Sequence, residues 1–438
     1  LIINDEIMNK SFFLNLGSIL FSIGIFLLVS APILGSISLF FSALLGTLIN
    51  NQKYLNDNWN KSFLICGTFI LLSTMKHILL GQDSYKDSLD PILSLVGTFN
   101  WLPFFWIFWG CQYYLNSRIK RKKTALLLIS GTFPLLVSGF GQYFFNWTGP
   151  LNILNGLIIW YQRPIQEHGL TGPFNNQNYA GAWLSLVWPF CIALILQKPK
   201  NIYHRIFSLI FLVSIVLAAF LTNSRNAWAS IFGSIPLVLG LGSLLWFLPI
   251  IIIISLIFSI TIFQPLSGSF QDLFRDIIPD KFWLEFAGEG IGIRKLTRLD
   301  IFISALKISS IDPFFGIGAG AFPILFELQK NIWRGHPHNI ILELAISYGY
   351  PVTLILFSTI VLLLILSAKI IFNKKSFNTE LIHFEKAWWT AIFMFCVTQL
   401  FDVQYFDARI SIIAWILLCG LKLMIDEANQ KEPSILEI

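Results

Sequence analysis

Long apolar runs dominate the chain and determine its expected fold. Runs of about 17 to 25 apolar residues are long enough to cross a bilayer as helices. The sequence predicts such helices at twelve places: 11–30, 31–49, 62–80, 92–115, 124–145, 180–197, 206–222, 227–241, 243–263, 340–372, 385–402 and 410–425. The first run lacks a small-residue cleavage pattern and is followed at once by a second, so it is expected to remain as a span. The expected fold class is an all-α, polytopic membrane helix bundle of about twelve transmembrane helices.

One of these runs is too long for a single straight span. Residues 340–372 contain Gly349 and Pro351, and both residue types interrupt helices. The sequence therefore predicts a short segment at the membrane edge, followed by a full span.

A polar stretch at 264–338 interrupts the apolar pattern. Its size and its Arg, Trp and His residues predict one large outward-facing loop. Within it, an amphipathic pattern predicts a short helix at the membrane surface, with these apolar positions: Ile301, Ile303, Ala305, Leu306 and Ile308. Three segments are expected: N-terminal transmembrane helices over 1–170, a core with the loop over 171–372, and C-terminal helices with a tail over 373–438.

Composition agrees with a membrane protein and excludes several other classes. Of the 438 residues, 55% are hydrophobic and only 12% are charged, whereas soluble domains have about 25% charged residues. All five cysteines lie within apolar runs, which predicts neither a disulfide framework nor a cysteine metal site. The basic residues form no long run with interleaved aromatic residues, so the expected partner is a lipid bilayer and not a nucleic acid.

The distribution of Lys and Arg predicts the orientation, because cytoplasmic loops carry an excess of these residues. With the N-terminus inside, the predicted inner loops hold most of the loop cations: Lys53, Lys61, Arg118, Lys120, Arg121, Lys122, Lys123, Lys198, Lys200, Arg205, Lys374, Lys375 and Lys386. The short outer loops carry few cations: Lys86, Arg163, Arg225 and Arg409. Both termini are thus expected in the cytoplasm, and the loops 146–179 and 264–338 are expected to face outward.

Arg225 is the first candidate for chemistry. It lies between two apolar runs, at the predicted outer face. A cation beside hydrocarbon is costly and is usually functional or paired. The alternative is an anchor whose charged end reaches the interface. Outer anchors are usually aromatic, and the excess of cations on the inner side disfavours Arg here, so a function is favoured.

The outer loop contains a second group of cations. Arg294, Lys295 and Arg298 precede the amphipathic helix, and the stretch 312–320, with Pro313 and three glycines, follows it as a tight turn. A glycine-rich turn alone is more often a loop than a phosphate site. The combination of cations, amphipathic helix and glycine turn within one outward loop points to a binding surface.

His336 and His338 flank a proline at the start of the next helix. Two histidines at this spacing could bind a metal, but no third ligand follows at a suitable spacing, so no metal site is expected. One interpretation is that they cap or pack the helix start. The other is that a neutral imidazole accepts a proton from a hydroxyl group near neutral pH. Asn339 either orients a substrate or satisfies the helix start.

Four carboxamides, Asn175 to Asn178, lead directly into a predicted span. One Asn is enough to cap a helix, so four exceed that need. Turn formation is the simplest role for Asn175 and Asn176. Asn178, closest to the apolar run, is the candidate for a buried structural or substrate-lining amide.

These segments, in this order, resemble the O-antigen ligase and O-antigen polymerase superfamily of bacterial membrane glycosyltransferases, over about residues 170 to 350. The segments that resemble family motifs are Gly172–Ala180 (Gly-x-Phe-x-Asn-x-Asn), Ser224–Trp228 (Ser-Arg-Gly/Asn-Ala), Arg298 with 312–320 (a second arginine and a Pro-hydrophobic-Gly-x-Gly turn), and His338-Asn339 (a His-Asn-x-x-Leu helix). One departure is that the family often has Glu two residues before the glycine, where this chain has Ser347, with Glu343 one turn earlier.

The resemblance implies transfer of a glycan from a polyprenyl-diphosphate carrier to a hydroxyl of a lipid or glycan acceptor, at the periplasmic face of the plasma (inner) membrane. It also implies inversion, no nucleotide sugar, no cofactor and no required metal. The residues that it implies are Arg225 and Arg298 for the diphosphate, His338 as the base, Arg294 and His336 in secondary roles, and Asn339, Asn178 and Glu343 as further substrate-binding residues.

Two other function classes remain open. Some cyanobacterial members of the superfamily are labelled as inorganic-carbon transport proteins, which keeps a transporter or transport accessory as an alternative. Transport predicts ionisable residues at mid-membrane and broken helices in paired halves, whereas here the polar groups gather in the outward loop. The third possibility is a scaffold of envelope biogenesis that has lost catalysis, since the Glu position of the family is altered.

Overall fold

The computed structural model describes residues 2–50, 54–80, 89–165, 168–197, 201–262, 268–277, 297–373 and 381–431. The first helices are α1 (Ile2–Leu27), α2 (Pro32–Ile49), η1 (Tyr54–Asn56), α3 (Asn58–Leu79), α4 (Pro91–Thr98), α5 (Leu102–Gly110), α6 (Gln112–Leu115), α7 (Arg118–Gly131) and α8 (Phe133–Phe145). An antiparallel hairpin of β1 (Leu151–Ile153) and β2 (Ile158–Trp160) follows.

The remaining elements are helical over the described residues. The middle ones are α9 (Gln177–Leu196), α10 (Ile202–Leu221), α11 (Arg225–Leu239), η2 (Leu241–Ser243), α12 (Leu244–Ile262) and α13 (Gly268–Ile277). The last ones are α14 (Arg298–Ser309), α15 (Ala321–Lys330), α16 (Ile340–Tyr348), α17 (Tyr350–Ile371), α18 (Ile382–Thr398) and α19 (Ala408–Lys431).

All twelve predicted runs lie on helices, which makes the molecule a polytopic helical membrane protein. Within the described ranges, eight stretches are long and apolar enough to cross a membrane: Pro32–Ile49, Asn58–Leu79, Pro91–Gly110, Arg118–Phe145, Gln177–Leu196, Ile202–Leu221, Tyr350–Ile371 and Ala408–Gln430. α11 and α18 have 15 and 17 residues. At 1.5 Å per residue such helices fall short of a hydrocarbon core about 30 Å thick. The described residues thus support eight of the twelve predicted spans, and Ser11–Leu27 and Ile252–Ile262 are shorter apolar helices.

The break predicted within 340–372 is confirmed. Gly349 separates α16 from α17 with a φ of +85°, a conformation that side chains other than glycine rarely adopt. Pro351 lies in the first turn of α17, where its missing N–H leaves no hydrogen bond unmade. A Cβ at Gly349 would lie 2.2 Å from the carbonyl oxygen of Phe314, so the break also allows the 312–320 turn to approach closely.

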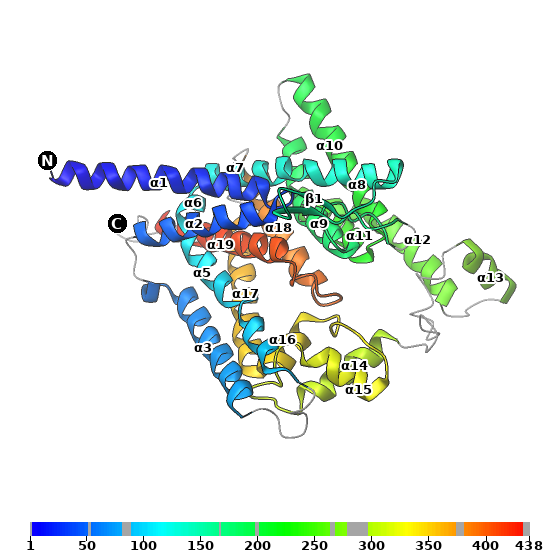
Figure 1. The fold of residues 1–438 in the computed structure, drawn as a ribbon. Coiled ribbons are helices and arrows are strands. Elements are labelled where there is room, and N and C mark those ends of the chain that lie inside the picture. Colours follow the sequence, from blue (N-terminus) through cyan, green and yellow to red (C-terminus); the bar gives the residue numbers. More distant parts are fainter. Residues whose placement is uncertain are drawn as a thin grey trace, which may run out of the picture.

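The core of the bundle is formed by α9, α18 and α19 (Figure 1). α9 packs against α10, α11 and α18, and α19 packs against α5, α17 and α18. Trp183, Trp388 and Trp415, one from each core helix, are fully buried. Helices of all three predicted segments share this core, and the segment boundaries at 170/171 and 372/373 remain predictions.

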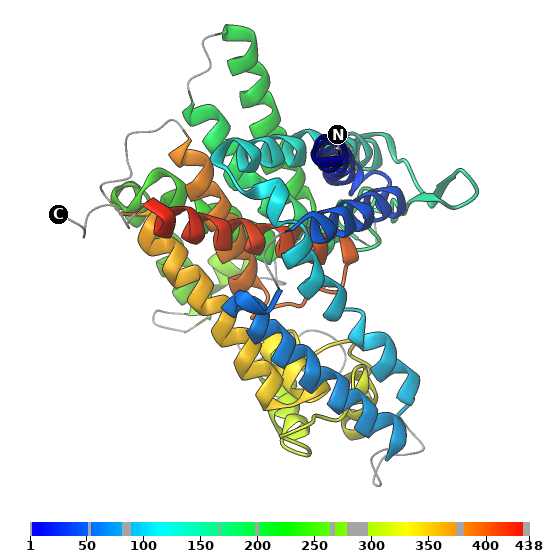
Figure 2. The same ribbon diagram turned by 90° about the vertical axis from the view of Figure 1, so that its left-hand side faces the viewer.

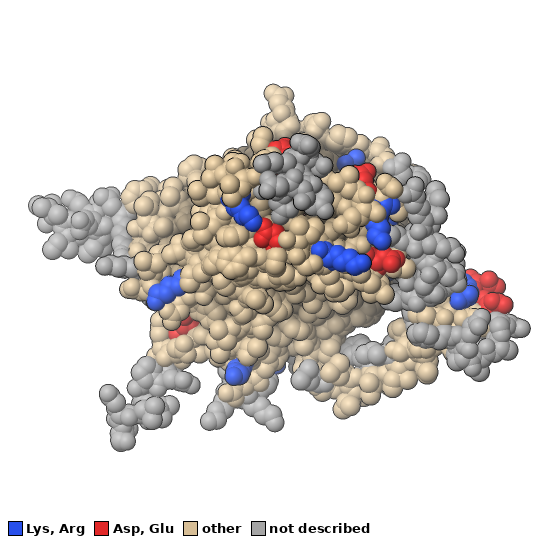
Figure 3. Space-filling model, turned by 90° about the horizontal axis from the view of Figure 1, so that it is seen from below, with Lys and Arg blue, Asp and Glu red and all other residues tan. Residues whose placement is uncertain are grey.

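Other helices expose apolar side chains, as expected for a surface covered by lipid. On α10, Phe207, Ile210 and Val213 are all exposed, and Figure 1 shows this helix projecting from the bundle. The face in Figure 3 consists mostly of uncharged residues, with a few charged side chains scattered over it. In water such a surface would be unfavourable, so these faces support a membrane location.

α14, α15 and α16 form a second, smaller core beside the bundle. The predicted amphipathic helix is α14, and Ile301, Ala305 and Ile308 are buried because positions i, i+4 and i+7 share one helix face. Ile303 and Leu306 were expected on the same face, but both are exposed.

α3 holds the glycine turn at 312–320 against the bundle. Lys76 forms an ion pair with Asp312, and the His77 ring nitrogen Nε2 lies 3.0 Å from the carbonyl oxygen of Gly316. Figure 2 shows α3 and α17 running side by side toward this turn and α14–α15. The 312–320 turn is thus fixed to α3.

Candidate active site

Asn339 ties the start of α16 to the loop after α18. Its Oδ1 accepts hydrogen bonds from the backbone N–H groups of Ile341 (3.0 Å) and Leu342 (3.1 Å), which caps the helix. Its Nδ2 donates to the carbonyl oxygen of Leu400 at 3.1 Å. The two preceding histidines are thereby placed beside residues 400–405.

A histidine–aspartate pair lies at this junction. His338 Nδ1 is 2.8 Å from Asp402 Oδ1. An ionised carboxylate only accepts hydrogen bonds, so Nδ1 carries the proton and Nε2 is left as an acceptor. His338 has a φ of +55°, which few residues other than glycine adopt, and backbone strain of this kind gathers at active sites. Its side chain is 29% exposed, so the ring is open to a substrate.

Asp402 is the functional candidate that sequence reasoning missed. Gln404 Nε2 lies 3.3 Å from its second oxygen, Oδ2. Burial acts to raise the pKa of Asp402, but the hydrogen bond from His338 and the nearby His336 and Arg298 outweigh it and lower that pKa below its ordinary value. One signal could have revealed it: Asp402 is an acid at the C-terminal end of the apolar run 385–402, where charge beside hydrocarbon is costly.

His336 lies against the pair. Its ring centroid is 4.4 Å from that of His338, and its Nε2 is 3.7 Å from Asp402 Oδ1. Its Nδ1 accepts a hydrogen bond from the His338 backbone N–H at 3.2 Å. Burial, with the neighbouring His338 and Arg298, lowers the pKa of His336 to about 4 against the opposing effect of Asp402. His336 is therefore neutral near pH 7.

Arg298 reaches the same loop from α14. Thr297 and Asp300 form a capping box that fixes the start of this helix. Arg298 Nη1 donates to the carbonyl oxygen of Phe401 at 2.7 Å. Because Phe401 precedes Asp402, the guanidinium lies beside the histidine–aspartate pair, and its side chain is exposed.

Arg225 begins α11, next to the end of α18. The neighbouring Asn226 Nδ2 donates to the carbonyl oxygen of Thr398 at 3.4 Å. Asp402 follows Thr398 by four residues, so the start of α11 approaches the loop that carries Asp402. Arg225 is half-buried there. Arg294, the remaining predicted cation, lies outside the described residues.

The carboxamide segment also borders this loop. Asn176 caps α9 by accepting from the backbone N–H of Asn178 at 2.7 Å, and Asn178 is half-buried in the first turn, so the expectation of a buried amide is not met. Arg409 joins this segment to the loop after α18. Its guanidinium carbon lies 3.7 Å from the centre of the Phe174 ring, and it pairs with Asp407 at 2.6 Å.

Glu343 lies one turn into α16 and is buried. Its Oε1 is 3.5 Å from the Ser347 hydroxyl, and its Oε2 has no hydrogen-bond partner among the described residues. Burial raises the pKa of Glu343 to about 7, against the effect of the Ser347 hydroxyl. The carboxyl group thus titrates near neutral pH.

His336, His338 and Asp402 could also hold a metal ion, because one ligand atom from each lies within 4.8 Å of the others. The third ligand comes from far along the chain, which spacing alone could not show. The 2.8 Å separation of His338 Nδ1 and Asp402 Oδ1 is that of a charge-assisted hydrogen bond. Hydrogen bonding therefore accounts for the position of both groups without a metal.

The fold and site define a polytopic helical membrane protein with a histidine–aspartate pair and an adjacent arginine at one end of its helices. Residues 209–357 match the O-antigen ligase family, so the chain carries an O-antigen ligase domain over this stretch. The match includes Arg225, Arg298 and His338 but ends before Asp402. No curated protein matches the chain.

Proposed function

We propose that this protein is a glycosyltransferase of the ligase or polymerase type. It transfers a glycan from a polyprenyl-diphosphate carrier to a hydroxyl of a lipid or glycan acceptor. The observation that carries the proposal is the hydrogen bond between His338 and Asp402, beside Arg298, in a chain with an O-antigen ligase domain. With its proton held on Nδ1, His338 can act as a base through Nε2, and the adjacent Arg298 can bind a phosphate group. This arrangement suits transfer from a lipid diphosphate.

His338 acts as the general base in this mechanism. Its Nε2 accepts the proton of the acceptor hydroxyl as that oxygen attacks the anomeric carbon. Asp402 holds the ring in the required tautomer and stabilises the imidazolium that forms. Neutral His336 does not repel that new positive charge. Attack from the side opposite the leaving group inverts the anomeric configuration.

The arginines stabilise the leaving group. As the bond from the anomeric carbon to the diphosphate oxygen breaks, the electron pair remains on the diphosphate. Arg298 and Arg225 bind the phosphate oxygens, and guanidinium–phosphate pairs are strong where water is scarce. No metal ion or other cofactor is required in this scheme.

The proposed location is the plasma (inner) membrane, with the site on the periplasmic side and both termini in the cytoplasm. The start of α1 and the end of α19 lie on the same side of the molecule (Figure 1), as an even number of crossings requires. An apolar cavity of about 100 Å³ extends from Ile340 and Leu400 between α16, α17, α18 and α19. We place the first part of the prenyl chain there.

The test is glycan transfer by single variants in membranes. Arg225→Ala, Arg298→Ala and His338→Ala should each lower transfer by at least about 100-fold, with unchanged membrane insertion. Lys307→Ala, an exposed cation on the same helix as Arg298, is the matched control and should keep full activity. The role assignment would be wrong if all three variants stayed active. Loss of transfer in a chelator, restored by a divalent ion, would contradict the metal-free scheme.

A further inference from the structure

A second cavity, of about 240 Å³, lies next to the histidine–aspartate pair. Gly335 lines it and directly precedes His336, and Phe406 lines it from the loop that carries Asp402. Its lining also includes Asn100, Trp101, Glu343 and Tyr348. Among the described residues that line it, none is Lys or Arg, so its chemistry differs from that of a phosphate site.

Two side chains that line this cavity carry buried polar atoms without a hydrogen-bond partner among the described residues. Glu343 is 8% exposed and Tyr348 is 2% exposed. Glu343 Oε2 and the Tyr348 hydroxyl have no hydrogen-bond partner among the described residues. Buried polar groups are almost always hydrogen-bonded, and leaving one unsatisfied is costly. Glu343 and Tyr348 both line this cavity, so a carboxyl group and a hydroxyl that lack partners at its wall point to a ligand that carries hydroxyl groups.

The aromatic wall of the cavity is held rigidly. Trp101 stacks on Tyr405 with ring centres 4.4 Å apart and an angle of 14° between the planes. The Tyr405 hydroxyl donates to the carbonyl oxygen of Asn100 at 2.7 Å. α4 is also pressed against this region, because a Cβ at Gly97 would lie 2.7 Å from the Tyr348 hydroxyl. The N-terminal helices, which lie outside the matched stretch 209–357, thus form one wall of this site.

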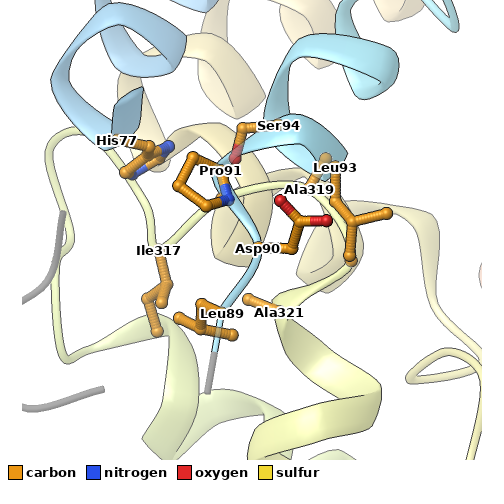
Figure 4. A pocket seen from close by; sticks show the side chains of 11 residues that line it. His77, Leu89, Asp90, Pro91, Leu93, Ser94, Ile317, Ala319 and Ala321 are labelled. Carbon is orange, nitrogen blue, oxygen red and sulfur yellow. The ribbon is translucent and has the colours of Figure 1, made fainter. Parts of the chain in front are cut away.

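A smaller cavity shares one wall with this site. It has a volume of about 40 Å³ and lies between His77, Asp90, Ser94 and the glycine turn (Figure 4). Leu93 and Gly320 line both cavities. A volume of this size holds about one water molecule, so only the larger cavity can admit a substrate group.

We infer that the larger cavity binds one uncharged sugar ring of the glycan substrates, next to the bond that is made. Its volume lies between that of a water molecule and the roughly 300 Å³ where sites for drug-sized ligands begin. Glu343 and Tyr348 bind the sugar hydroxyls, and the flat, largely apolar face of the ring packs on Trp101 and Phe406. This inference rests on the proposed function and names the subsite that selects the sugar.

The first experiment measures binding of sugars to the full chain in lipid nanodiscs. The probes are methyl glycosides of several neutral hexoses and N-acetylhexosamines, with inorganic pyrophosphate as the charged comparison, and saturation-transfer NMR is the readout. At least one glycoside should bind. Glu343→Gln should weaken its binding by about 10-fold, and Tyr348→Phe by about threefold. Pyrophosphate binding should not change in either variant.

The matched control is Glu327→Gln, which removes an exposed carboxylate on α15 and should leave sugar binding unchanged. Thermal midpoints of all variants show whether the fold is kept. The inference is overturned if no glycoside binds the parent protein. It is equally overturned if folded Glu343→Gln and Tyr348→Phe bind glycosides as the parent does.

A second experiment shows whether the bound sugar belongs to the lipid-linked donor or to the acceptor. It also tests the sugar subsite separately from the proposed glycan transfer. In a transfer assay, Glu343→Gln should raise KM by about 10-fold for either the lipid-linked donor or the acceptor, with kcat nearly unchanged. The substrate whose KM rises is the one whose ring occupies the cavity. If His338→Ala and Arg298→Ala abolish transfer but Glu343→Gln changes neither KM, only the subsite is wrong. If sugars bind through Glu343 but no transfer occurs, only the proposed function is wrong.

Discussion

At the residue scale, Asp402 determines what His338 can do. The carboxylate fixes the proton on Nδ1, leaves Nε2 as the base, and offsets the charge of the imidazolium. It also positions a residue whose backbone is held in the left-handed region. In the proposed mechanism His338 and Asp402 therefore act together as the general base.

Asp402→Asn should therefore lower kcat strongly while the fold is retained. The amide keeps the size of the side chain but removes the negative charge, so we expect a loss of about 100-fold or more. Transfer rates in membrane vesicles provide the measurement. Asp272→Asn, at an exposed position on α13, is the control. A kcat equal to that of the parent would show that Asp402 does not assist the base.

Glu343 should make stability depend on pH. Because its pKa in the folded chain is about 7, above the ordinary 4.5, the folded chain holds a proton that the unfolded chain has released between these pH values. The contribution of Glu343 to the free energy of unfolding is therefore fully present below about pH 4.5. It decreases as the pH rises to about 7, by at most about 3 kcal/mol at 1.36 kcal/mol per pH unit. In Glu343→Gln this contribution disappears.

Thermal unfolding in detergent at pH 5 and pH 8 measures this effect. The thermal midpoint of Glu343→Gln minus that of the parent should be larger at pH 8 than at pH 5. A constant difference across this range would mean that the carboxyl group is ionised and solvated in the folded protein.

At the element scale, helices and their breaks could be predicted well from the sequence. Apolar runs located the helices, and Gly349 located the break between α16 and α17, because these signals are local. The β1–β2 hairpin was not predicted within the loop 146–179. The role of Asp402 was not predicted either, since its partner His338 lies 64 residues away and only the packing of α16 against the α18–α19 loop joins them. The roles given to Arg298 and His338 rest on the resemblance of their segments to family motifs, and they stay predictions.

The break at Gly349 can be tested directly. Gly349→Ala combines a positive φ with a Cβ only 2.2 Å from the Phe314 carbonyl oxygen, so it should displace the glycine turn. Gly156→Ala provides the control, because it has a similar φ of +90° but nothing within 4 Å of the added Cβ. Strain from φ alone costs about 1–3 kcal/mol.

Thermal midpoints of the two variants distinguish the backbone strain of a positive φ from the steric clash with the Phe314 carbonyl oxygen. Gly349→Ala should be clearly less stable than Gly156→Ala and should lose transfer activity. Equal destabilisation of the two variants would show that the close approach to the turn does not matter.

At the scale of the whole molecule, α18 and α19 carry the site at one end and buried ion pairs at the other. Arg121 contacts Glu385 at 2.9 Å and Glu427 at 2.8 Å, and Lys422 contacts Asp57 at 2.9 Å. Removing one partner of a buried ion pair strongly destabilises the folded protein, because it leaves an uncompensated buried charge. These pairs therefore hold α3, α7, α18 and α19 in fixed register, and this register positions Asp402 against α16.

The transport alternative also belongs to this scale. A transporter needs a substrate path through the bilayer, with ionisable residues along it. In the described residues the ion pairs lie near helix ends, and the titratable cluster lies in loops. Uptake of labelled bicarbonate into vesicles that contain only this protein would nevertheless favour transport over glycan transfer.

One measurement tests the central claim most directly: an experimental structure of the full chain in a nanodisc with a polyprenyl diphosphate bound. We expect phosphate oxygens within hydrogen-bond distance of both Arg225 and Arg298, and His338 Nε2 on the far side of the space that the transferred sugar would occupy. A diphosphate bound elsewhere, with the two arginines and His338 in separate compartments, would contradict the proposed mechanism.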